Sequence, residues 1–436
     1  MIPTLLLSSC KKEDIRVFEK SSDERLSEAL QRYNDVLTSA PYGWKTIIYP
    51  SAGGYAFYFE FKKDGTVTSF SDINLKAAGT PLKSTYRLKA LQQPSLLFDT
   101  YTYLHLLSDP DGRVNGGNDG EGLLSDFEFM IDSVSTNTIH LKGTVHGSVV
   151  QLVSATQADQ KSYYDGEVAN SFSRTTAYLQ TNQNPYLDLD RKLPVAIDIR
   201  QKVFTILSLK ANGLVEEKSV LFTFTSTGII FKEPITVGNL TFQELLWDTN
   251  EKNYYVLVGG KKIFLKNGSE PVTLVEGGIF ENFLLPEGAI DSTNAIPGQS
   301  DEFLMAYKEI KKRLLASRYK LTLTFMYFRF NNATTLDLIV GVFQINPTTG
   351  NREDFTAVFP YTVKRAANGN TTFSLRAAPS GNAGLIVNEM APFLDYLTTD
   401  TFRFEQQFSG AVGRMGRMNN ITRTEFFFTG AIYLLQ

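Results

Sequence analysis

Residues 55–68 read YAFYFEFKKDGTVT, and this stretch decides the fold class. Every second residue from Phe57 to Phe61 is phenylalanine, so the rings lie on one face of an extended strand. The pair Asp64-Gly65 is typical of a two-residue hairpin turn, and the TVT that follows starts a second strand. The stretch therefore predicts an antiparallel hairpin with one face in a core and the other in water.

Similar short segments with short turns extend over most of the chain. Phe (32 residues) and Tyr (20 residues) are abundant, and aromatic residues favour strands. The segments predicted as strands are 84–89, 95–101, 126–132, 138–142, 149–153, 194–199, 203–208, 219–225, 229–232, 240–247, 254–258, 356–362, 371–376, 401–408 and 422–434. We expect a mainly β protein with a few helices, built from antiparallel meanders.

A helix precedes the first strands. Ser21 and Glu24 have the spacing of a capping box, and an apolar stripe runs from Leu26 to Leu37 before Pro41 ends the pattern. A helix followed by a closing meander predicts a lipocalin-like barrel, or a curved sheet packed on the N-terminal helix. A sandwich is the next choice. A membrane barrel would show similar alternation, but the helices and the globular charge balance argue against it.

The chain divides into regions. A Gly-, Pro-, Ser- and Asn-rich linker covers 286–298, and the opening stripe returns at a constant offset as Phe303, Tyr307, Ile310 and Leu314. We therefore expect a tether at 1–19, a β-rich region at 20–290 that can hold two units divided near 157–170, and a helix-plus-meander domain at 291–436.

Composition excludes several classes of protein. A chain of 436 residues exceeds one ordinary core, and a net charge of −3 without a basic block argues against nucleic-acid partners. A single cysteine excludes intrachain disulfides and a Cys-based zinc cage. No apolar run approaches the length of about 20 residues that a membrane helix needs.

The single cysteine lies near the amino end. Leu7-Ser8-Ser9-Cys10 resembles a bacterial lipobox, in which the thiol receives a diacylglycerol, although no basic n-region precedes it. The polar residues at 11–14 resemble a surface-export signal of Bacteroidetes lipoproteins. We expect an outer-membrane protein, lipid-anchored at Cys10 and exposed at the cell surface. The alternative is a small buried thiol followed by a solvated linker.

The segment 108–122 is rich in oxygen ligands and glycine. Asp109, Asp111, Asp119 and Glu121 could supply the oxygens that calcium prefers. However, Arg113 occupies a position where an EF-hand needs an oxygen, and a solvated loop explains the composition equally well. We expect no cofactor other than this possible calcium. The histidines show no metal-ligand spacing.

Paired carboxylates offer one catalytic hypothesis. Asp126 and Glu128 are two residues apart on a predicted strand, close to glycosidase carboxylate separations, although such acids usually come from different strands. A solvent-exposed face of the sheet would explain the two acids equally well. No GxSxG elbow, Walker loop or dinucleotide fingerprint is present.

Aromatic side chains are the remaining candidates for ligand contacts. Flat rings bind sugars through C–H faces, and aromatic residues are enriched at protein interfaces. The candidates are Trp44, Tyr58, Tyr101, Tyr103 and Trp247. Trp44, which follows Gly43, could instead plug a barrel where the helix meets the first strand.

Several of these pieces together resemble a known family. They are the lipobox, Glu24-Arg25, Ala40-Pro41-Tyr42-Gly43-Trp44, Phe59-x-Phe61-x-x-Asp64-Gly65-x-Val67, Ser84-x-Tyr86-x-Leu88, Leu97-Phe98-Asp99-Thr100-Tyr101, His105 with Ser108-Asp109-Pro110, and Asp126-Phe127-Glu128-Phe129. The chain resembles an uncharacterised lipoprotein family of gut Bacteroidetes, the domain-of-unknown-function group 4302. The resemblance is dense over 20–155 and implies a role beside import systems that pair a TonB-dependent channel with a surface binding lipoprotein. It implies no catalytic residue.

We therefore expect a surface-anchored accessory lipoprotein that captures nutrient by binding, with a glycan or a peptide as ligand. Neighbouring proteins of the import complex are possible further partners. One alternative is a glycan-active hydrolase that uses paired carboxylates. The other is a structural subunit that docks on an import complex.

Overall fold

The computed structural model describes residues 20–90, 93–210, 213–276, 281–286 and 296–432. It contains two compact units, the first formed by Met1–Phe172 with Thr223–Ser226 and the second by Ser173–Phe222 with Thr227–Gln436. Strands predominate over helices among the described residues, and neighbouring strands pair antiparallel. The predicted fold class is therefore confirmed.

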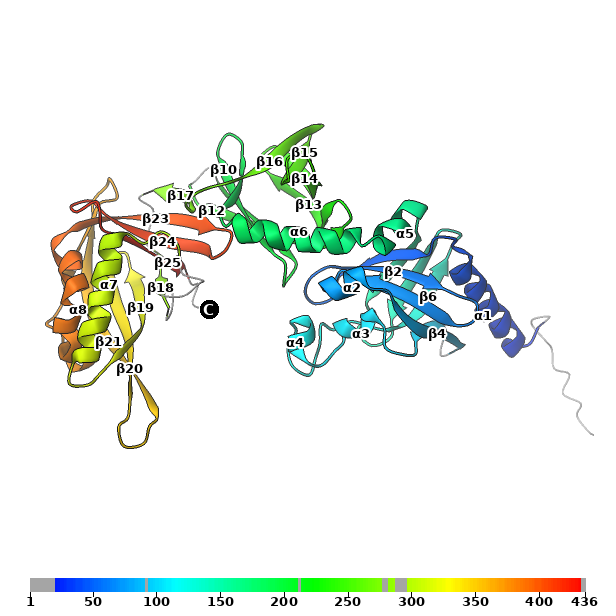
Figure 1. Ribbon diagram of the computed structural model, residues 1–436, viewed down its shortest axis with the longest axis horizontal. Helices are drawn as coiled ribbons and strands as arrows, with labels where there is room; N and C mark the ends of the chain where they lie inside the picture. Colours follow the sequence, from blue (N-terminus) through cyan, green and yellow to red (C-terminus); the bar gives the residue numbers. More distant parts are fainter. Residues whose placement is uncertain (1–19, 91–92, 211–212, 277–280, 287–295, 433–436) are drawn as a thin grey trace, which may run out of the picture. The chain divides into compact units, whose positions relative to one another are not determined.

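Barrel 1 is the closed eight-stranded barrel of the first unit (Figure 1). Its strands are β1 (Trp44–Ile48), β2 (Tyr55–Phe61), β3 (Thr66–Ser71), β4 (Leu82–Ala90), β5 (Pro94–Phe98), β6 (Glu128–Val134), β7 (Thr138–Gly143) and β8 (Val149–Ser154). The pairing of β1 with β8 closes it, with Trp44 opposite Ser154. The rings of Phe57 and Phe59 stack inside at 5.7 Å, as the alternation predicts.

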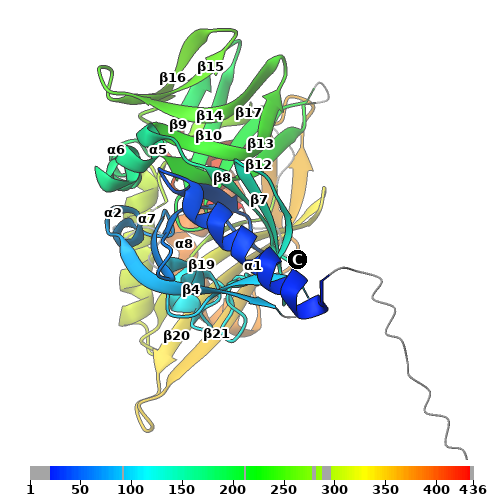
Figure 2. The ribbon, with the colours of Figure 1, turned by 90° about the vertical axis from the view of Figure 1, so that its right-hand side faces the viewer.

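Helix α1 (Ser22–Ser39) closes one end of barrel 1, and it lies against β4 (Figures 1 and 2). The predicted capping box between Ser21 and Glu24 is present. The Trp44 indole N–H donates to the Leu37 carbonyl at 2.8 Å, and the Tyr86 hydroxyl donates to Asn34 Oδ1 at 2.9 Å. These buried contacts tie the helix to the strands that it covers.

The long connection at residues 99–127 closes the other end. It contains α3 (Tyr103–Leu107) and α4 (Gly112–Asn115), while α2 (Leu75–Gly79) joins β3 to β4. Leu104, Leu107 and Leu123 belong to the same buried cluster as the rings of β2. Barrel 1 is therefore filled from end to end by its own side chains.

Barrel 2 is the closed eight-stranded barrel of the second unit. Its strands are β9 (Pro185–Asp188), β10 (Lys192–Asp198), β11 (Val203–Leu209), β12 (Val215–Thr225), β13 (Gly228–Val237), β14 (Leu240–Asp248), β15 (Asn253–Val258) and β16 (Lys261–Asn267). The pairing of β16 with β9 closes it. Each strand is joined to the next by a short connection, so successive turns lie at opposite ends of the barrel.

Helix α6 (Glu167–Thr181), which follows α5 (Gln157–Tyr164), closes one end of barrel 2. Tyr178 of α6 packs edge-on against the buried Tyr254 ring at 5.2 Å, and the Thr175 hydroxyl contacts the Tyr254 hydroxyl. The rings of Phe204 and Phe231 fill the interior at 4.7 Å. Barrel 2 therefore repeats the order of barrel 1, a helix and then eight antiparallel strands.

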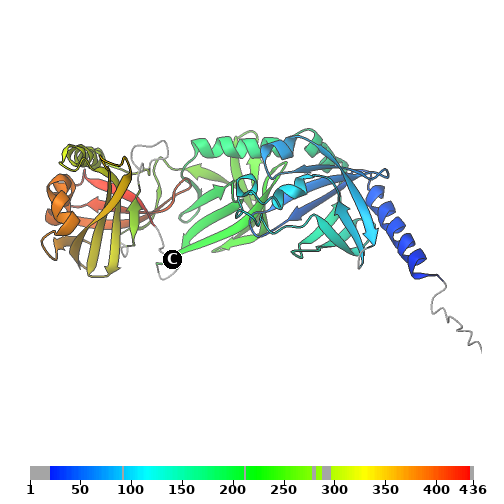
Figure 3. The same cartoon turned by 90° about the horizontal axis from the view of Figure 1, so that it is seen from below.

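The C-terminal sheet varies this plan (Figures 1 and 3). Its strands are β17 (Val272–Glu276), β18 (Phe283–Leu285), β19 (Thr322–Asn332), β20 (Thr335–Ile345), β21 (Arg352–Arg365), β22 (Thr371–Leu375), β23 (Thr401–Ser409), β24 (Gly413–Asn420) and β25 (Phe427–Ile432). Because β23 also pairs with β24 and β18 with β25, the strands from β18 to β25 form a continuous ring.

Two helices supply the core of this sheet. They are α7 (Asp301–Ala316) and α8 (Gly381–Thr399), which pack against each other (Figure 3). Phe303 of α7 stacks on Phe428 at 5.0 Å, and Phe393 of α8 packs edge-on against Phe328 at 6.0 Å. The predicted helix at 303–314 is confirmed as α7.

Several elements were not predicted, among them β9, β16, β17, β18, β20, β24 and α8, and for the last two the reason is local. Helix α8 contains glycines near its start and Pro392 within it, and all of these residues weaken helix signals. Strand β24 reads GRMGRMNN and lacks β-branched and aromatic residues. Both elements form because of tertiary contacts: α8 packs against α7 and β21, and β24 pairs with β23 and β25.

The Trp44 contact can be tested by truncation. Trp44→Ala removes a fully buried side chain and its hydrogen bond to Leu37, so we expect the free energy of unfolding to fall by about 3–5 kcal/mol. Val149→Ala, at a position 79% exposed on the same barrel, serves as the control and should change it by less than about 0.5 kcal/mol. Urea denaturation followed by far-UV circular dichroism measures both. Equal stability of the two variants would contradict this account of the barrel end.

Candidate functional site

The open end of barrel 2 forms a cavity of about 680 Å³, here called the mouth. It lies at the end opposite α6, where the turns β9–β10 and β13–β14 reach the rim. The residues that line it are Leu189, Asp190, Arg191, Leu193, Ser208, Leu209, Glu216, Val237, Gly238, Asn239, Leu240, Val258 and Ile263. The walls are thus aliphatic, with a few polar groups among them.

Connection length explains why one barrel is filled and the other is open. In barrel 1 the chain between β5 and β6 runs through residues 99–127 and buries leucines in the barrel end. In barrel 2 the equivalent connection between β13 and β14 is only Gly238 and Asn239. Two turn residues carry no side chain large enough to fill the opening, so the mouth stays accessible.

The polar groups of the mouth come from defined strand positions. Ser208 and Glu216 are opposite each other in the register of β11 and β12, and the Ser208 hydroxyl donates to Glu216 Oε2 at 3.4 Å. Ser208 is 9% exposed, and the Glu216 side chain is half-buried. Asp190 and Arg191 are exposed on the β9–β10 turn. The mouth therefore combines an inner carboxylate with a charged rim.

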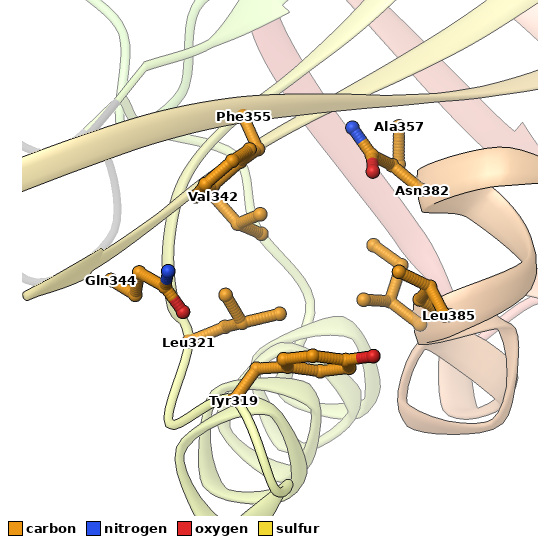
Figure 4. A pocket seen from close by; sticks show the side chains of 9 residues that line it. Tyr319, Leu321, Val342, Gln344, Phe355, Ala357, Asn382 and Leu385 are labelled. Carbon is orange, nitrogen blue, oxygen red and sulfur yellow. The ribbon is translucent and has the colours of Figure 1, made fainter. Parts of the chain in front are cut away.

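A second, smaller cavity lies in the C-terminal sheet (Figure 4). It measures about 140 Å³ and is lined by Tyr319, Leu321, Val342, Gln344, Phe355, Ala357, Asn382, Leu385 and Ile386. Its amides are already engaged, since Gln344 donates to Glu353 and Asn382 donates to the Thr356 carbonyl, both at 2.9 Å. A cavity of this size has room for one ring-sized apolar group. The mouth is larger than this cavity and richer in polar groups.

Two of the predicted ligand-binding residues are core residues of the first unit. Trp44 and Tyr58 have no exposed surface, so neither ring can stack on a ligand. Tyr58 does point away from the Phe57 face, but Tyr163 of α5 covers it at 5.0 Å. Its hydroxyl donates to the Tyr42 carbonyl at 2.7 Å. The pKa of this phenol is raised, and burial is the main cause.

The other three predicted rings have different surroundings. Tyr103 is buried, and its hydroxyl donates to the Thr80 carbonyl at 2.8 Å. Tyr101 is 53% exposed and stacks on His105, where burial lowers the pKa of the imidazole. Trp247 is half-buried beside α6, with Arg174 over its ring at 5.0 Å. Trp247 therefore belongs to the sealed end of barrel 2, not to the mouth.

The predicted calcium ligands mostly bond within their own loop. Asp109 and Asp119 accept backbone N–H groups at 2.9 Å and 3.0 Å, and Asp111 forms an ion pair with Arg113. Glu121 accepts from the Asn118 amide at 3.1 Å. Among the described residues no group of three or more acidic, histidine or cysteine side chains could hold a metal ion. The calcium hypothesis rests on loop composition alone.

One residue of the predicted catalytic pair, Asp126, has a structural role. Asp126 is 3% exposed, and its carboxylate accepts backbone N–H groups of Val145, His146 and Ser148 at 2.8–3.0 Å. Burial raises the pKa of Asp126, but the hydrogen bonds from His146, Ser148 and Val145 outweigh burial and lower the pKa overall. Asp126 thus holds the β7–β8 turn and lacks a free oxygen pair for acid–base work.

A comparison with sequence families agrees with the expected resemblance. The profile described as Domain of unknown function (DUF4302) matches residues 14–249, which include barrel 1 and β9–β14 of barrel 2. The chain belongs to the DUF4302 family. No curated protein matches the chain.

The family match does not assign chemistry to any residue of this DUF4302 protein. It does cover the mouth residues from Leu189 to Leu240, so most of the mouth lies inside the family region. None of the helices in the described part of the chain has the length and apolar character needed to cross a membrane. Cys10 and the tether at 11–14 lie outside the described residues.

Sequence reasoning did not find the mouth. One signal was present, because Phe204, Ile206 and Ser208 alternate along β11, so Ser208 places a hydroxyl on the inward face. Glu216 and Lys218, which pair with Ser208 and Ile206, break the inward apolar pattern of β12 in the same way. A polar residue on an inward face marks either a satisfied core group or a cavity, and only the closed barrel decides between them.

The role of Asp126 predicts a pH effect on stability. Because the folded pKa is lowered, the carboxylate stabilises the fold above the unfolded value near 3.9, and this contribution is lost as the pH falls through the folded pKa. We expect Asp126→Asn to cost about 1–3 kcal/mol at pH 7 and progressively less towards pH 2. Urea denaturation at both pH values gives this difference. A cost that stays constant with pH would rule out the ionised carboxylate as its source.

Proposed function

We propose that this DUF4302 protein is a surface-anchored accessory lipoprotein of a nutrient-import system, and that it captures a glycan or a peptide in the mouth of barrel 2. The single observation that carries the proposal is the asymmetry of barrel 2. One end is sealed by α6, and the other opens into a cavity of about 680 Å³. An eight-stranded barrel that its own side chains do not fill has room for one small ligand.

The composition of the mouth supports binding. Ligand sites are typically concave and largely apolar, and a few placed polar groups fix the orientation of the ligand. Here the half-buried Leu209, Val258 and Ile263 supply accessible apolar wall, while Ser208 and Glu216 supply a hydroxyl and a carboxylate on one side. Such an arrangement can hold a molecule by recognition alone.

The location part of the proposal rests on sequence. The lipobox ending in Cys10, the charged tether after it and the start of α1 at Ser22 are in the order expected of a lipid-anchored globular protein. A diacylglycerol on Cys10 would hold the barrels beside the outer membrane. Nutrient bound in the mouth would then be close to an import channel.

The alternatives have less support. A hydrolase that uses Asp126 and Glu128 would need two carboxylates free to meet a substrate, and Asp126 is held by three backbone donors. A structural subunit that docks on an import complex would need no accessible cavity. A pull-down with neighbouring import proteins, in the presence and absence of ligand, separates docking from capture.

Blocking the mouth tests the capture proposal. Val258 lines the mouth, whereas its neighbour Leu257 is 49% exposed on the outer face of β15. We expect Val258→Trp to abolish binding of ligands identified on a glycan and peptide array, because the indole fills the opening, and Leu257→Trp to leave binding unchanged. Unchanged binding by Val258→Trp, with both variants folded by circular dichroism, would place the binding site elsewhere.

Lipid attachment is tested separately. In cells that make the full-length precursor, we expect radiolabelled palmitate to enter the wild-type protein and to be absent from Cys10→Ser. The wild type should fractionate with the outer membrane, and the variant should not. Label in Cys10→Ser, or an unlabelled wild type, would contradict the lipobox interpretation.

A further inference from the structure

The walls of the mouth contain no aromatic ring among the described lining residues. The phenylalanines of barrel 2, such as Phe204 and Phe242, are buried below the mouth. The apolar surface offered to a ligand is therefore formed by branched aliphatic side chains.

This composition disfavours a glycan. Sugar rings are commonly held by stacking their C–H faces on flat aromatic rings, and their many hydroxyls need hydrogen-bonding partners once they leave water. The accessible side chains of Leu209, Val258 and Ile263 offer neither. They favour a ligand that buries aliphatic surface of its own.

The charges of the mouth restrict the ligand further. The half-buried Glu216 carboxylate has the Ser208 hydroxyl beside it at a long 3.4 Å, so a cation reaching this depth would gain a charge-assisted hydrogen bond. At the rim, the Arg191 guanidinium can bind a carboxylate in a bidentate manner. A ligand with an ammonium group for Glu216 and a carboxylate group for Arg191 is a zwitterion.

A fatty acid fits these charges poorly. Its carboxylate could reach Arg191, but its acyl tail would then cover Glu216 and leave that charge without water and with the long Ser208 contact as compensation. The size of the cavity is also informative. About 680 Å³ lies within the range of roughly 300–1,000 Å³ that accommodates ligands of a few linked residues.

We propose that the mouth of barrel 2 binds short peptides with aliphatic side chains, with the ligand ammonium at Glu216 and its carboxylate at the Arg191 rim. The inference rests on the proposed function and chooses the peptide over the glycan. No bond is made or broken, and the contribution of the protein is recognition alone.

The experiment is isothermal titration of the full chain with four probes. They are trileucine, N-acetyl-trileucine, decanoate and maltotriose. We expect trileucine to bind and maltotriose and decanoate not to bind. Acetylation removes the ammonium charge and should weaken binding about tenfold or more, the size of effect of a lost charge-assisted hydrogen bond.

A matched pair of variants tests the inner carboxylate. Glu216→Gln removes the charge inside the mouth, and Glu217→Gln removes the same charge at the next residue, which is exposed. We expect Glu216→Gln to weaken trileucine binding about tenfold and Glu217→Gln to leave it within about twofold. If Glu216→Gln fails to fold by circular dichroism, Glu216→Asp, which keeps the charge and shortens its reach, is measured instead and should also weaken binding.

The possible outcomes separate this inference from the proposed function. Binding of maltotriose that Val258→Trp blocks would overturn the peptide inference and leave capture in the mouth intact. Trileucine binding that is insensitive to acetylation and to Glu216→Gln would also overturn the inference. If Val258→Trp blocks no ligand from the arrays or from the four probes, capture in the mouth is itself wrong.

Discussion

Closing an antiparallel sheet into a barrel removes its edges and leaves two open ends, and this constraint governs the rest of the molecule. The interior of an eight-stranded barrel is about as wide as its own side chains can fill. Each end must therefore be covered by another part of the chain or left open to water. In barrel 1 the Trp44 indole, bonded to the Leu37 carbonyl, joins the covering helix to the first strand. In barrel 2 the contacts of α6 with Tyr254 serve the same purpose.

The uncovered end is where the two barrels differ. The connection at residues 99–127 buries leucines in barrel 1, whereas Gly238 and Asn239 leave the same position of barrel 2 open. Leu193, Val237 and Leu240 are buried even here. The half-buried Leu209, Val258 and Ile263, however, keep aliphatic surface accessible to water and so forgo part of the stabilisation that burial would provide. A ligand with aliphatic surface would recover that stabilisation on binding, which is the physical link between the short turn and the proposed capture function.

Several carboxylates that looked chemically active in the sequence turn out to satisfy the backbone. Asp126 binds the N–H groups of the β7–β8 turn, and Asp109 and Asp119 bind N–H groups within their own loop. These bonds stabilise the fold, because leaving a buried backbone N–H group unpaired costs about as much free energy as losing a hydrogen bond. By contrast, Glu216 has a long contact of 3.4 Å with the Ser208 hydroxyl and lines the cavity, so its carboxylate is placed to meet a ligand.

Local sequence by itself determined most of the strands, the capping box of α1 and the predicted helix that became α7, because alternation and capping are properties of neighbouring residues. It also carried enough pattern to indicate the family to which the chain belongs. It could not show that Trp44 and Tyr58 are covered by α1 and α5, nor that β24 and α8 exist, since these depend on partners distant in the chain. The mouth was decided by tertiary structure alone. A polar residue on an inward face becomes part of a cavity only when the strands around it close and no loop fills the space above.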